Sequence, residues 1–381
     1  MVIGYDAKKI ICDNDEIAEY GRMMIDALSG CYIHNHYMIY TPKEMENKLL
    51  SPFLSRSTVH LKTPRSTLFG CKWRRGKGVL RHAKRHGVRV FHGLNGMLPG
   101  PLAKSHMHSV VNVPFTRFID EPETCGWMEK AILNHDVKKS TSFANRIITA
   151  TNTAKQSLME RYGIDEERIN VVYPGCDDRY HRDFTENELK SIAHKYGLPK
   201  RYILLLGDIT PKSGAMLLTE VLNQLKDEDV CLLLIGKGSS FYQKNIKEFA
   251  HRHGIRHRIM HISKVHQADI PAILHMATVL ALPKAGQSNV MMLAKAQCCL
   301  TPTVVASDAM AQEVGDGAAL YAQADDCSSF AQAIDSILAN EALRQRLIDT
   351  ASARRDLFTK QAMADSVMAI YEKISENHHK R

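Results

Sequence analysis

The sequence predicts an α/β protein of two doubly wound parallel-sheet domains, and the apolar pattern and the chain length carry that prediction. Short apolar runs alternate with helix patterns from one end of the chain to the other. Strands that are apolar throughout and are separated by helices are typical of parallel sheets covered on both faces. The length of 381 residues also exceeds what one ordinary core supports, so two domains are expected.

The strand candidates of the first half are separated by helix patterns with recognisable ends. One such helix, predicted over 153–163, places Leu158, Met159 and Tyr162 on one stripe and stops at Gly163. The predicted strands lie within 1–7, 36–42, 88–94, 109–115, 146–151 and 169–175.

The second half repeats this rhythm after a segment, 175–200, that lacks an apolar run. We therefore expect a first domain over 1–180, a linker over 181–200 and a second domain over 201–362. The predicted strands of the second domain lie within 201–208, 231–238, 259–264, 278–283, 302–307 and 318–322.

Composition and cysteine usage exclude several classes of protein. Hydrophobic content of 44% and charged content of 24% are ordinary for a globular chain and argue against disorder. No run approaches the roughly 18 apolar residues of a membrane span, and the start reaches acidic residues too early for a signal peptide. Of the nine Cys only Cys298 and Cys299 are neighbours, and no Cys/His spacing suits a metal. We expect free thiols, a cytoplasmic location and no metal site.

The net charge of +9 is unevenly spread. The stretch 72–90 is rich in Lys and Arg and contains no acid, so it would attract phosphates, an anionic acceptor or the inner face of a membrane. A solvated helix face is the alternative. Nucleic acid is not an expected partner, because only Trp73 offers a stacking ring. The residues of the predicted patch are Arg74, Arg75, Lys77, Arg81, Lys84 and Arg85.

Two strand-to-helix turns of the second domain have the features of phosphate-binding turns. Gly207 permits a sharp turn into a helix start whose free amides would face an anion, and Lys212 stands beside it. Gly236 and Gly238 repeat the design after the next strand. Neither turn has the order of a Walker loop. The alternative is that each glycine only serves a tight turn. Ligands of such sheets lie beyond the carboxyl ends of the strands, so we expect residues 207–214, 236–240 and 283–289 around one pocket in a cleft between the domains.

Taken together, these segments resemble the retaining glycosyltransferases of family 4, which have the GT-B fold of two facing Rossmann-like domains. The resemblance covers nearly the whole chain. It implies a nucleotide-diphosphate sugar held by the second domain, an acceptor hydroxyl held by the first, and no metal or cofactor. It also implies that a final helix, over 363–381, returns to the first domain. The matching segments are 3–10, 19–24, 36–42, 91–100, 146–177, 202–215 and 301–326.

The resemblance assigns roles to individual residues. The acceptor-side residues are His92 and Asn95, and a structural role for His92 is the alternative.

Asp13-Asn14-Asp15 looks like a metal-binding pair, but a solvated turn is the more common role of such a sequence. Asp177, Asp178, Asp325 and Asp326 are expected in turns, and Glu313 at a helix end. The residues expected to hold the donor are Gly207, Lys212, Gly236, Gly238, Gln287, Asn289 and Lys295.

Two departures from the family pattern fall in the first domain. The family's glycine-rich loop after the opening strand is replaced by a segment with Glu16 and Glu19, which would repel a diphosphate. The His-Asp pair that many members carry is replaced by Pro114 and Phe115.

Two further departures fall in the second domain. The family's Arg-Lys pair becomes Lys212-Ser213, and its two Glu positions hold Gln287 and Lys295. Gln287 can still donate and accept hydrogen bonds, whereas a lysine at 295 cannot accept one. Val290 stands where a small residue with positive φ is usual, so a different loop path is expected.

These departures leave two interpretations open. The first is a transferase that moves a hexose from a nucleotide-diphosphate sugar to a glycan or lipid-linked acceptor in surface polysaccharide biosynthesis. The second is a catalytically retired homologue that acts as a non-catalytic partner subunit. The second interpretation predicts no nucleotide binding and an exposed apolar patch on one domain.

Overall fold

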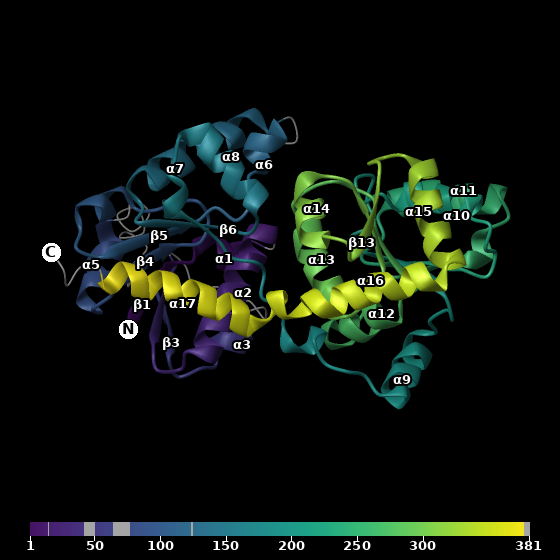
Figure 1. The fold of residues 1–381 in the computed structure, drawn as a ribbon, viewed down its shortest axis with the longest axis horizontal. Helices are drawn as coiled ribbons and strands as arrows, with labels where there is room; N and C mark the ends of the chain where they lie inside the picture. Colours follow the sequence, from purple (N-terminus) through teal and green to yellow (C-terminus); the bar gives the residue numbers. More distant parts are fainter. Residues whose placement is uncertain (14, 42–49, 64–76, 123–124, 377–381) are drawn as a thin grey trace. The chain divides into compact units, whose positions relative to one another are not determined.

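The computed structural model divides the chain into two compact units, one of which includes both ends of the chain (Figure 1). The first unit is Met1–Gly175 together with Thr359–Arg381, and the second is Cys176–Phe358. The residues that the structure describes are 1–13, 15–41, 50–63, 77–122 and 125–376.

Among the described residues, the first unit contains a seven-stranded sheet in the order β3-β2-β1-β4-β5-β6-β7 with parallel pairing throughout. The chain moves outward one way from β1 to β3 and the other way from β4 to β7, so the strand order reverses between β1 and β4. The strands are β1 (Val2–Asp6), β2 (His36–Tyr40), β3 (Val59–Lys62), β4 (Val90–Gly93), β5 (His108–Asn112), β6 (Arg146–Thr149) and β7 (Ile169–Val171).

The helices of the first unit have ends that the sequence explains. The Thr151 side chain accepts a hydrogen bond from the Ala154 amide at the start of α8, and Gly163 ends that helix with a φ of 63°. The helices are α1 (Lys8–Cys12), α2 (Glu16–Cys31), α3 (Ser51–Leu54), α5 (Lys77–Arg85), η3 (Gly100–Lys104), α6 (Arg117–Asp120), α7 (Trp127–Phe143), α8 (Asn152–Tyr162), η5 (Glu166–Arg168) and α17 (Lys360–Glu376).

The second unit has a six-stranded parallel sheet within the described residues, in the order β10-β9-β8-β11-β12-β13. Its strand order reverses between β8 and β11. The inner strands β8, β9, β11 and β12 are almost wholly buried, as their continuous apolar sequences predict, whereas the edge strands β10 and β13 are partly exposed. They are β8 (Tyr202–Leu206), β9 (Cys231–Ile235), β10 (Ile259–Ile262), β11 (Val279–Leu282), β12 (Thr303–Ala306) and β13 (Ala319–Ala322).

Helices cover this second sheet, and the core lies between them and the strands. Leu218, Leu222 and Phe330 from α10 and α15 pack against strand residues such as Leu232 and Val304. The helices are η6 (Asp178–Tyr180), α9 (Glu186–Tyr196), α10 (Ala215–Gln224), η7 (Tyr242–Ile246), α11 (Lys247–Arg252), η8 (Arg256–Arg258), η9 (Gln267–Asp269), α12 (Ile270–Met276), α13 (Ser288–Cys298), α14 (Ala309–Gly315), α15 (Cys327–Ala339), α16 (Glu341–Arg354) and η10 (Arg355–Phe358).

The boundaries of the units differ from the predicted ones. The segment 181–200, expected to be a linker, belongs to the second unit, because its helix α9 packs against α12. The Lys195 ammonium pairs with Asp269 at 2.7 Å, and the Tyr196 hydroxyl donates to the same carboxylate at 2.7 Å. A segment without an apolar strand can still fold as an amphipathic helix on its neighbour, which the strand count alone does not reveal.

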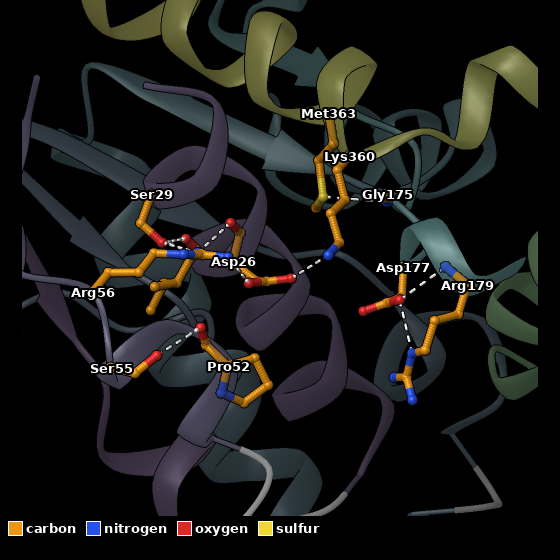
Figure 2. Close-up of polar contacts among 11 residues, drawn as sticks. Asp26, Ser29, Pro52, Ser55, Arg56, Gly175, Asp177, Arg179, Lys360 and Met363 are labelled. Carbon is orange, nitrogen blue, oxygen red and sulfur yellow. Dashed lines mark hydrogen bonds and ion pairs between the residues drawn. The ribbon is translucent and has the colours of Figure 1, made fainter. Parts of the chain in front are cut away.

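The last helix, α17, lies in the first unit and packs along α2. At its start, the Lys360 ammonium lies 2.8 Å from the Asp26 carboxylate, which also receives Arg56 at 2.7 Å (Figure 2). Nearby, the amide of Gly175 donates to the Met363 sulfur at 3.2 Å (Figure 2), and a Cβ on Gly175 would lie 2.8 Å from the Met363 Cβ. The first residues of α17 are thus fixed by charge and by close packing.

Candidate functional site

The reversal of strand order in the second sheet marks the place where a ligand is expected. In open α/β sheets the loops beyond the carboxyl ends of the strands leave a crevice where the order reverses. In this unit the two loops at that point follow β8 and β11. They touch each other, because a Cβ on Gly214 would lie 2.3 Å from the Pro283 side chain.

The turn after β8 requires glycine at its first residue. Gly207 has a φ of 128°, a conformation that L side chains rarely adopt, and is exposed. No atom of the residues that the structure describes lies within 4 Å of the position that its Cβ would take. Packing therefore does not explain this glycine, and the backbone here is open to a ligand.

The remainder of that turn presents a cation and a helix start. Ser213, at the family's second basic position, closes the turn by donating to the Thr210 carbonyl at 2.8 Å. Lys212 is exposed and forms no ion pair with any residue that the structure describes. Helix α10 begins at Ala215, and its N-cap, Gly214, has a φ of 75° and no side chain to cap the first turn. The Ala215 amide donates to the Ser213 hydroxyl at 3.3 Å. Lys212 and the next amides of the first turn, which receive no side-chain cap, are thus available to an anion.

The turn after β9 has glycines for a different reason. A Cβ on Gly236 would lie 2.0 Å from the Gly207 carbonyl oxygen, and one on Gly238 would lie 2.6 Å from the His261 ring. The His261 Nε2 in turn hydrogen-bonds the Gly236 carbonyl at 2.8 Å. The Gly207 amide donates to the Ile235 carbonyl at 2.9 Å, which ties the two turns together. Gly236 and Gly238 therefore support Gly207 by allowing close packing.

The loop after β11 follows a different path from the family's glycine-rich loop, as expected. Helix α13 begins at Ser288, so Val290 is helical and fully buried, and the positive φ of 131° falls on Gly286 instead. The Gly286 amide donates to the Asp308 carboxylate at 3.0 Å. Asn289, expected to bind the donor, is buried and donates to the Lys284 carbonyl at 2.7 Å. That hydrogen bond makes Asn289 a support of the loop.

The two residues at the family's Glu positions have different surroundings. Gln287 is 8% exposed, and its side chain makes no hydrogen bond to another described residue. Lys295 lies two turns further along α13, where its ammonium sits 5.8 Å from the centre of the Tyr180 ring. Lys295 thus contacts an aromatic face of its own unit, while Gln287 remains at the crevice with its amide unengaged by the chain.

In the first unit His92 is a core residue. It is fully buried, its Nε2 contacts the Asn112 Oδ1 at 2.7 Å, and its Nδ1 contacts the Tyr371 hydroxyl at 2.6 Å. Burial lowers the pKa of His92 to about 3. These contacts favour the structural role over the acceptor contact that the resemblance implies.

Asn95 lies where the order of the first sheet reverses, just after β4. Its side-chain oxygen is buried and has no hydrogen-bond partner among the described residues. An unpaired buried oxygen is costly unless a ligand or water satisfies it. Asp6, at the end of β1, pairs in register with Gly93, and burial raises the pKa of this carboxyl. Sequence reasoning missed Asp6. Its position at the strand end was the available signal.

The segment after β1 is closed to anions. The Asp15 carboxylate accepts from the Ala18 amide at 2.8 Å and pairs with Lys9 at 2.8 Å, so it caps α2. Glu16 and Glu19 add negative charge to the first turn of that helix. This engagement of Asp15 supports the turn interpretation of Asp13-Asn14-Asp15, although residue 14 lies outside the described residues.

Other predicted positions have structural partners. Phe115 is buried with its ring 6.2 Å from that of Tyr20, and the Pro114 carbonyl accepts from the Ala150 amide. Asp177 accepts from the Arg179 amide and side chain (Figure 2), and Asp326 caps α15.

The predicted basic patch is described only in part. Arg74 and Arg75 lie outside the described residues, whereas Lys77, Arg81, Lys84 and Arg85 all lie on α5 and are exposed. The apolar side of this helix, with Val79, Leu80 and Ala83, is buried. No helix in the described part of the chain has the length and apolar character to cross a membrane.

Comparison with protein families finds two matching models. Residues 34–180 match the model described as Glycosyltransferase Family 4, and residues 187–354 match the one described as Glycosyl transferases group 1.

Curated relatives resemble part of the chain. The D-inositol 3-phosphate glycosyltransferase of Xylanimonas cellulosilytica is 26% identical over 237 residues, which are 60% of this chain and 57% of the relative. The enzyme of the same name from Corynebacterium glutamicum is 23% identical over 239 residues, with coverage of 60% and 57%. The matches therefore span a little over half the length of these relatives.

Solved structures resemble the whole chain. Anabaena HepE in complex with UDP and glucose superimposes with a TM-score of 0.75 at 16% identity, covering 98% of this chain and 100% of that one. Sucrose-phosphate synthase from Thermosynechococcus elongatus gives a TM-score of 0.76 at 15% identity, with 99% of each chain covered. At such identities the likeness shows the fold alone.

Proposed function

Since the chain belongs to the family 4 glycosyltransferases and has their GT-B fold, we propose that it transfers a hexose from a nucleotide-diphosphate sugar. The predicted fold class and family resemblance are confirmed. The proposal adds the donor, the acceptor and the reaction course. The acceptor is a hydroxyl of a glycan or lipid-linked glycan in surface polysaccharide biosynthesis.

The observation that carries the proposal is the crevice after β8 and β11 in the second unit. It combines the exposed backbone of Gly207, the ammonium of Lys212, which forms no ion pair with a described residue, and the start of α10, whose N-cap is a glycine. A departing nucleoside diphosphate carries negative charge that develops as the sugar leaves. Fixed amides and an ammonium group stabilise such charge without having to reorganise. These three features form a leaving-group site within one unit.

The amide of Gln287 suits the sugar end of the donor. Its side chain is free of hydrogen bonds to the described residues and can both donate to and accept from sugar hydroxyls. By the family's chemistry the reaction retains anomeric configuration and uses no metal. In this chain the second unit then serves chiefly to position the donor.

On the acceptor side, Asn95 and Asp6 are the polar groups best placed at the strand ends of the first unit. The unpaired oxygen of Asn95 can accept from an acceptor hydroxyl. Asp6, with a raised pKa, can accept or hold a proton near neutral pH more readily than an ordinary aspartate.

The relatives named D-inositol 3-phosphate glycosyltransferases suggest a phosphorylated cyclitol as a second acceptor to screen. The exposed cations of α5 suit peripheral contact with an anionic membrane.

A thermal-shift and calorimetric screen against UDP, GDP, ADP and their sugar conjugates tests the proposal. A ligand present at one hundred times its Kd stabilises the folded chain by about 2.7 kcal/mol. We expect one nucleotide series to stabilise the protein and its sugar conjugate to be consumed when an acceptor is added. Uniform absence of binding across the series would contradict the proposal.

One observation favours the second candidate, a non-catalytic partner subunit. Trp127, Met128 and Ile132 at the start of α7 are 79%, 58% and 55% exposed. Large apolar side chains exposed together are typical of an interaction surface. A subunit of this kind would bind no nucleotide and would form a defined complex that is lost when Trp127 and Ile132 are replaced by Ser. The nucleotide screen therefore separates the two candidates.

A further inference from the structure

We propose that the amino-terminal edge of the first unit's sheet, the edge opposite the strand ends that carry Asn95, holds a phosphate-binding pocket. The pocket has a volume of about 610 Å³. Among the described residues, its lining includes the basic residues Lys84, Arg89, Lys104, His106 and His108, together with Ser375, and no Asp or Glu. We call this set the edge pocket.

The sheet register places Arg89 and His108 side by side. Val90, the first residue of β4, pairs with His108, the first residue of β5. Arg89 immediately precedes that pair, and its carbonyl accepts the His108 amide at 2.9 Å. Because the strands are parallel, both residues lie at the amino-terminal edge. This location separates the edge pocket from any site beyond the carboxyl ends of the same strands.

The other cations reach the pocket from separate elements. Lys84 comes from the last turn of α5, Lys104 from the end of η3, and Ser375 from the last turns of α17. The ends of α5 and α17 lie at the same side of the first unit (Figure 1). Convergence of cations from elements far apart in sequence differs from a charge run, in which neighbours along one helix simply face water.

Three of these cations have no acidic partner in the described part of the chain. Lys84, Arg89 and Lys104 are exposed and take part in no ion pair there. The two hydroxyl groups are already engaged: Ser105 donates to the Leu102 carbonyl at 2.9 Å, and Ser375 donates to the Tyr371 carbonyl at 2.7 Å. Recognition in the pocket therefore depends on charge and on the guanidinium fork.

These features select a phosphate group as the ligand. Arg89 offers paired N–H donors in the geometry that phosphate oxygens accept, and the lysines add point charges around it. Val88 and Met107 supply apolar lining beside the charges, which suits a phosphate carried on an organic group. That phosphate can be the headgroup of a membrane phospholipid or a free phosphate ester. The chemistry is the same for both sources.

The experiment uses the full chain and two matched double variants. Arg89→Ser with Lys104→Ser removes two charges from the edge pocket. Lys138→Ser with Arg161→Ser removes two exposed charges from α7 and α8 of the same unit. Thermal unfolding checks that each variant is folded. If the pocket double variant does not fold, the single variant Lys104→Gln is compared with the control variant in its place.

Two probes separate the two sources of phosphate. Glycerol 3-phosphate is titrated by calorimetry, and phosphatidylcholine vesicles with and without phosphatidic acid are tested by co-sedimentation. A basic side chain near an anionic lipid surface contributes about fivefold in affinity, so the pocket variant should bind phosphatidic acid vesicles about 25-fold more weakly. The control variant should change by less than about threefold.

Each outcome decides the proposal. Binding of glycerol 3-phosphate that is lost in the pocket variant assigns a free phosphate ester. Binding confined to phosphatidic acid vesicles, with the same loss, assigns a lipid headgroup. Equal losses of probe binding in the pocket and control variants would overturn the proposal of a phosphate site in the edge pocket. Absence of binding of either probe by the unmodified chain would also overturn it.

Discussion

The two units have the same sheet plan, and each reverses its strand order once, but the segments after their opening strands differ in charge and in how their helices are capped. After β8, the chain presents an exposed glycine, Lys212 without an ion pair to any described residue, and a helix whose N-cap is a glycine. The one acid of this turn, Asp208, accepts from the Lys237 amide at 3.2 Å. After β1, it presents a helix already capped by Asp15 and flanked by Glu16 and Glu19. Helix starts attract anions only while their amides are unoccupied and no acid stands beside them. We therefore expect a diphosphate to bind in the second unit.

The largest expected effect comes from Gly236, which supports the open turn. Gly236→Ala places a Cβ 2.0 Å from the Gly207 carbonyl oxygen at a φ of 150°. We expect a loss of at least about 3 kcal/mol in the free energy of unfolding, measured by urea titration. Gly254→Ala is the control, because its φ of 71° brings strain without any atom within 4 Å, and it should cost about 1 kcal/mol. Equal costs would show that the two turns are not packed as described.

The next prediction concerns His92 and pH. Burial holds its pKa at about 3 in the folded chain, below the value of about 6.5 in the unfolded chain. The unfolded state therefore takes up the proton first as pH falls, and stability is lost progressively from pH 6.5 toward 3. Between pH 6.5 and pH 4 the free energy of unfolding falls by about 3 kcal/mol through this histidine.

NMR of the His92 ring checks this prediction directly. The ring should remain neutral down to about pH 4, and urea titrations of a His92→Gln variant should lack this part of the pH dependence. A ring that titrates near pH 6.5 would indicate a solvent-accessible histidine and would restore the acceptor contact.

Replacing Lys212 tests whether the turn after β8 binds a diphosphate. Lys212→Ala removes a charge-assisted contact to the diphosphate, worth about 2 kcal/mol, so nucleoside diphosphate affinity should fall about 30-fold by calorimetry. Lys226→Ala removes the same charge from the turn after α10, at the other edge of the same sheet, and should leave affinity within about twofold. Similar losses in both variants would indicate only a general charge effect.

The smallest effect is expected at the start of α17. Lys360→Met removes the 2.8 Å ion pair with Asp26 and leaves Arg56 as the partner of that carboxylate. A loss of about 1 kcal/mol in the free energy of unfolding is expected, because both side chains of the pair are mostly buried. Lys190→Met, which breaks the exposed pair with Glu186, should change stability by less than about 0.5 kcal/mol. The reverse order would contradict the anchoring of α17 through Asp26.

The fold was predictable because it depends on the apolar pattern, whereas the roles of single residues depend on contacts that the pattern does not encode. The alternation of apolar strands and helices predicted both parallel sheets, and Gly207 and Lys212 lie on the expected turn. Nothing in the sequence distinguishes Gly207, which faces open space, from Gly236, which packs against it.

His92 and α9 show the same limit. A histidine after a strand suits either a ligand or the core, and only the contacts with Asn112 and Tyr371 decide between them. Tyr371 is 279 residues away in sequence. Helix α9 has no fully buried residues. It packs on α12 through a half-buried apolar stripe that includes Leu189 and Ile192, and through polar contacts with Asp269 that no local pattern reveals.

The most direct test of the central claim is a methyl NMR titration of the full chain with the nucleoside diphosphate that the screen identifies. Ile209 and Ala215 report on the turn after β8, and Ile10 and Ala18 report on the capped start of α2. If the diphosphate binds after β8, the largest shifts occur at Ile209 and Ala215 and are lost in Lys212→Ala. Shifts centred on Ile10 and Ala18, or no shifts at either turn, would contradict binding at that turn.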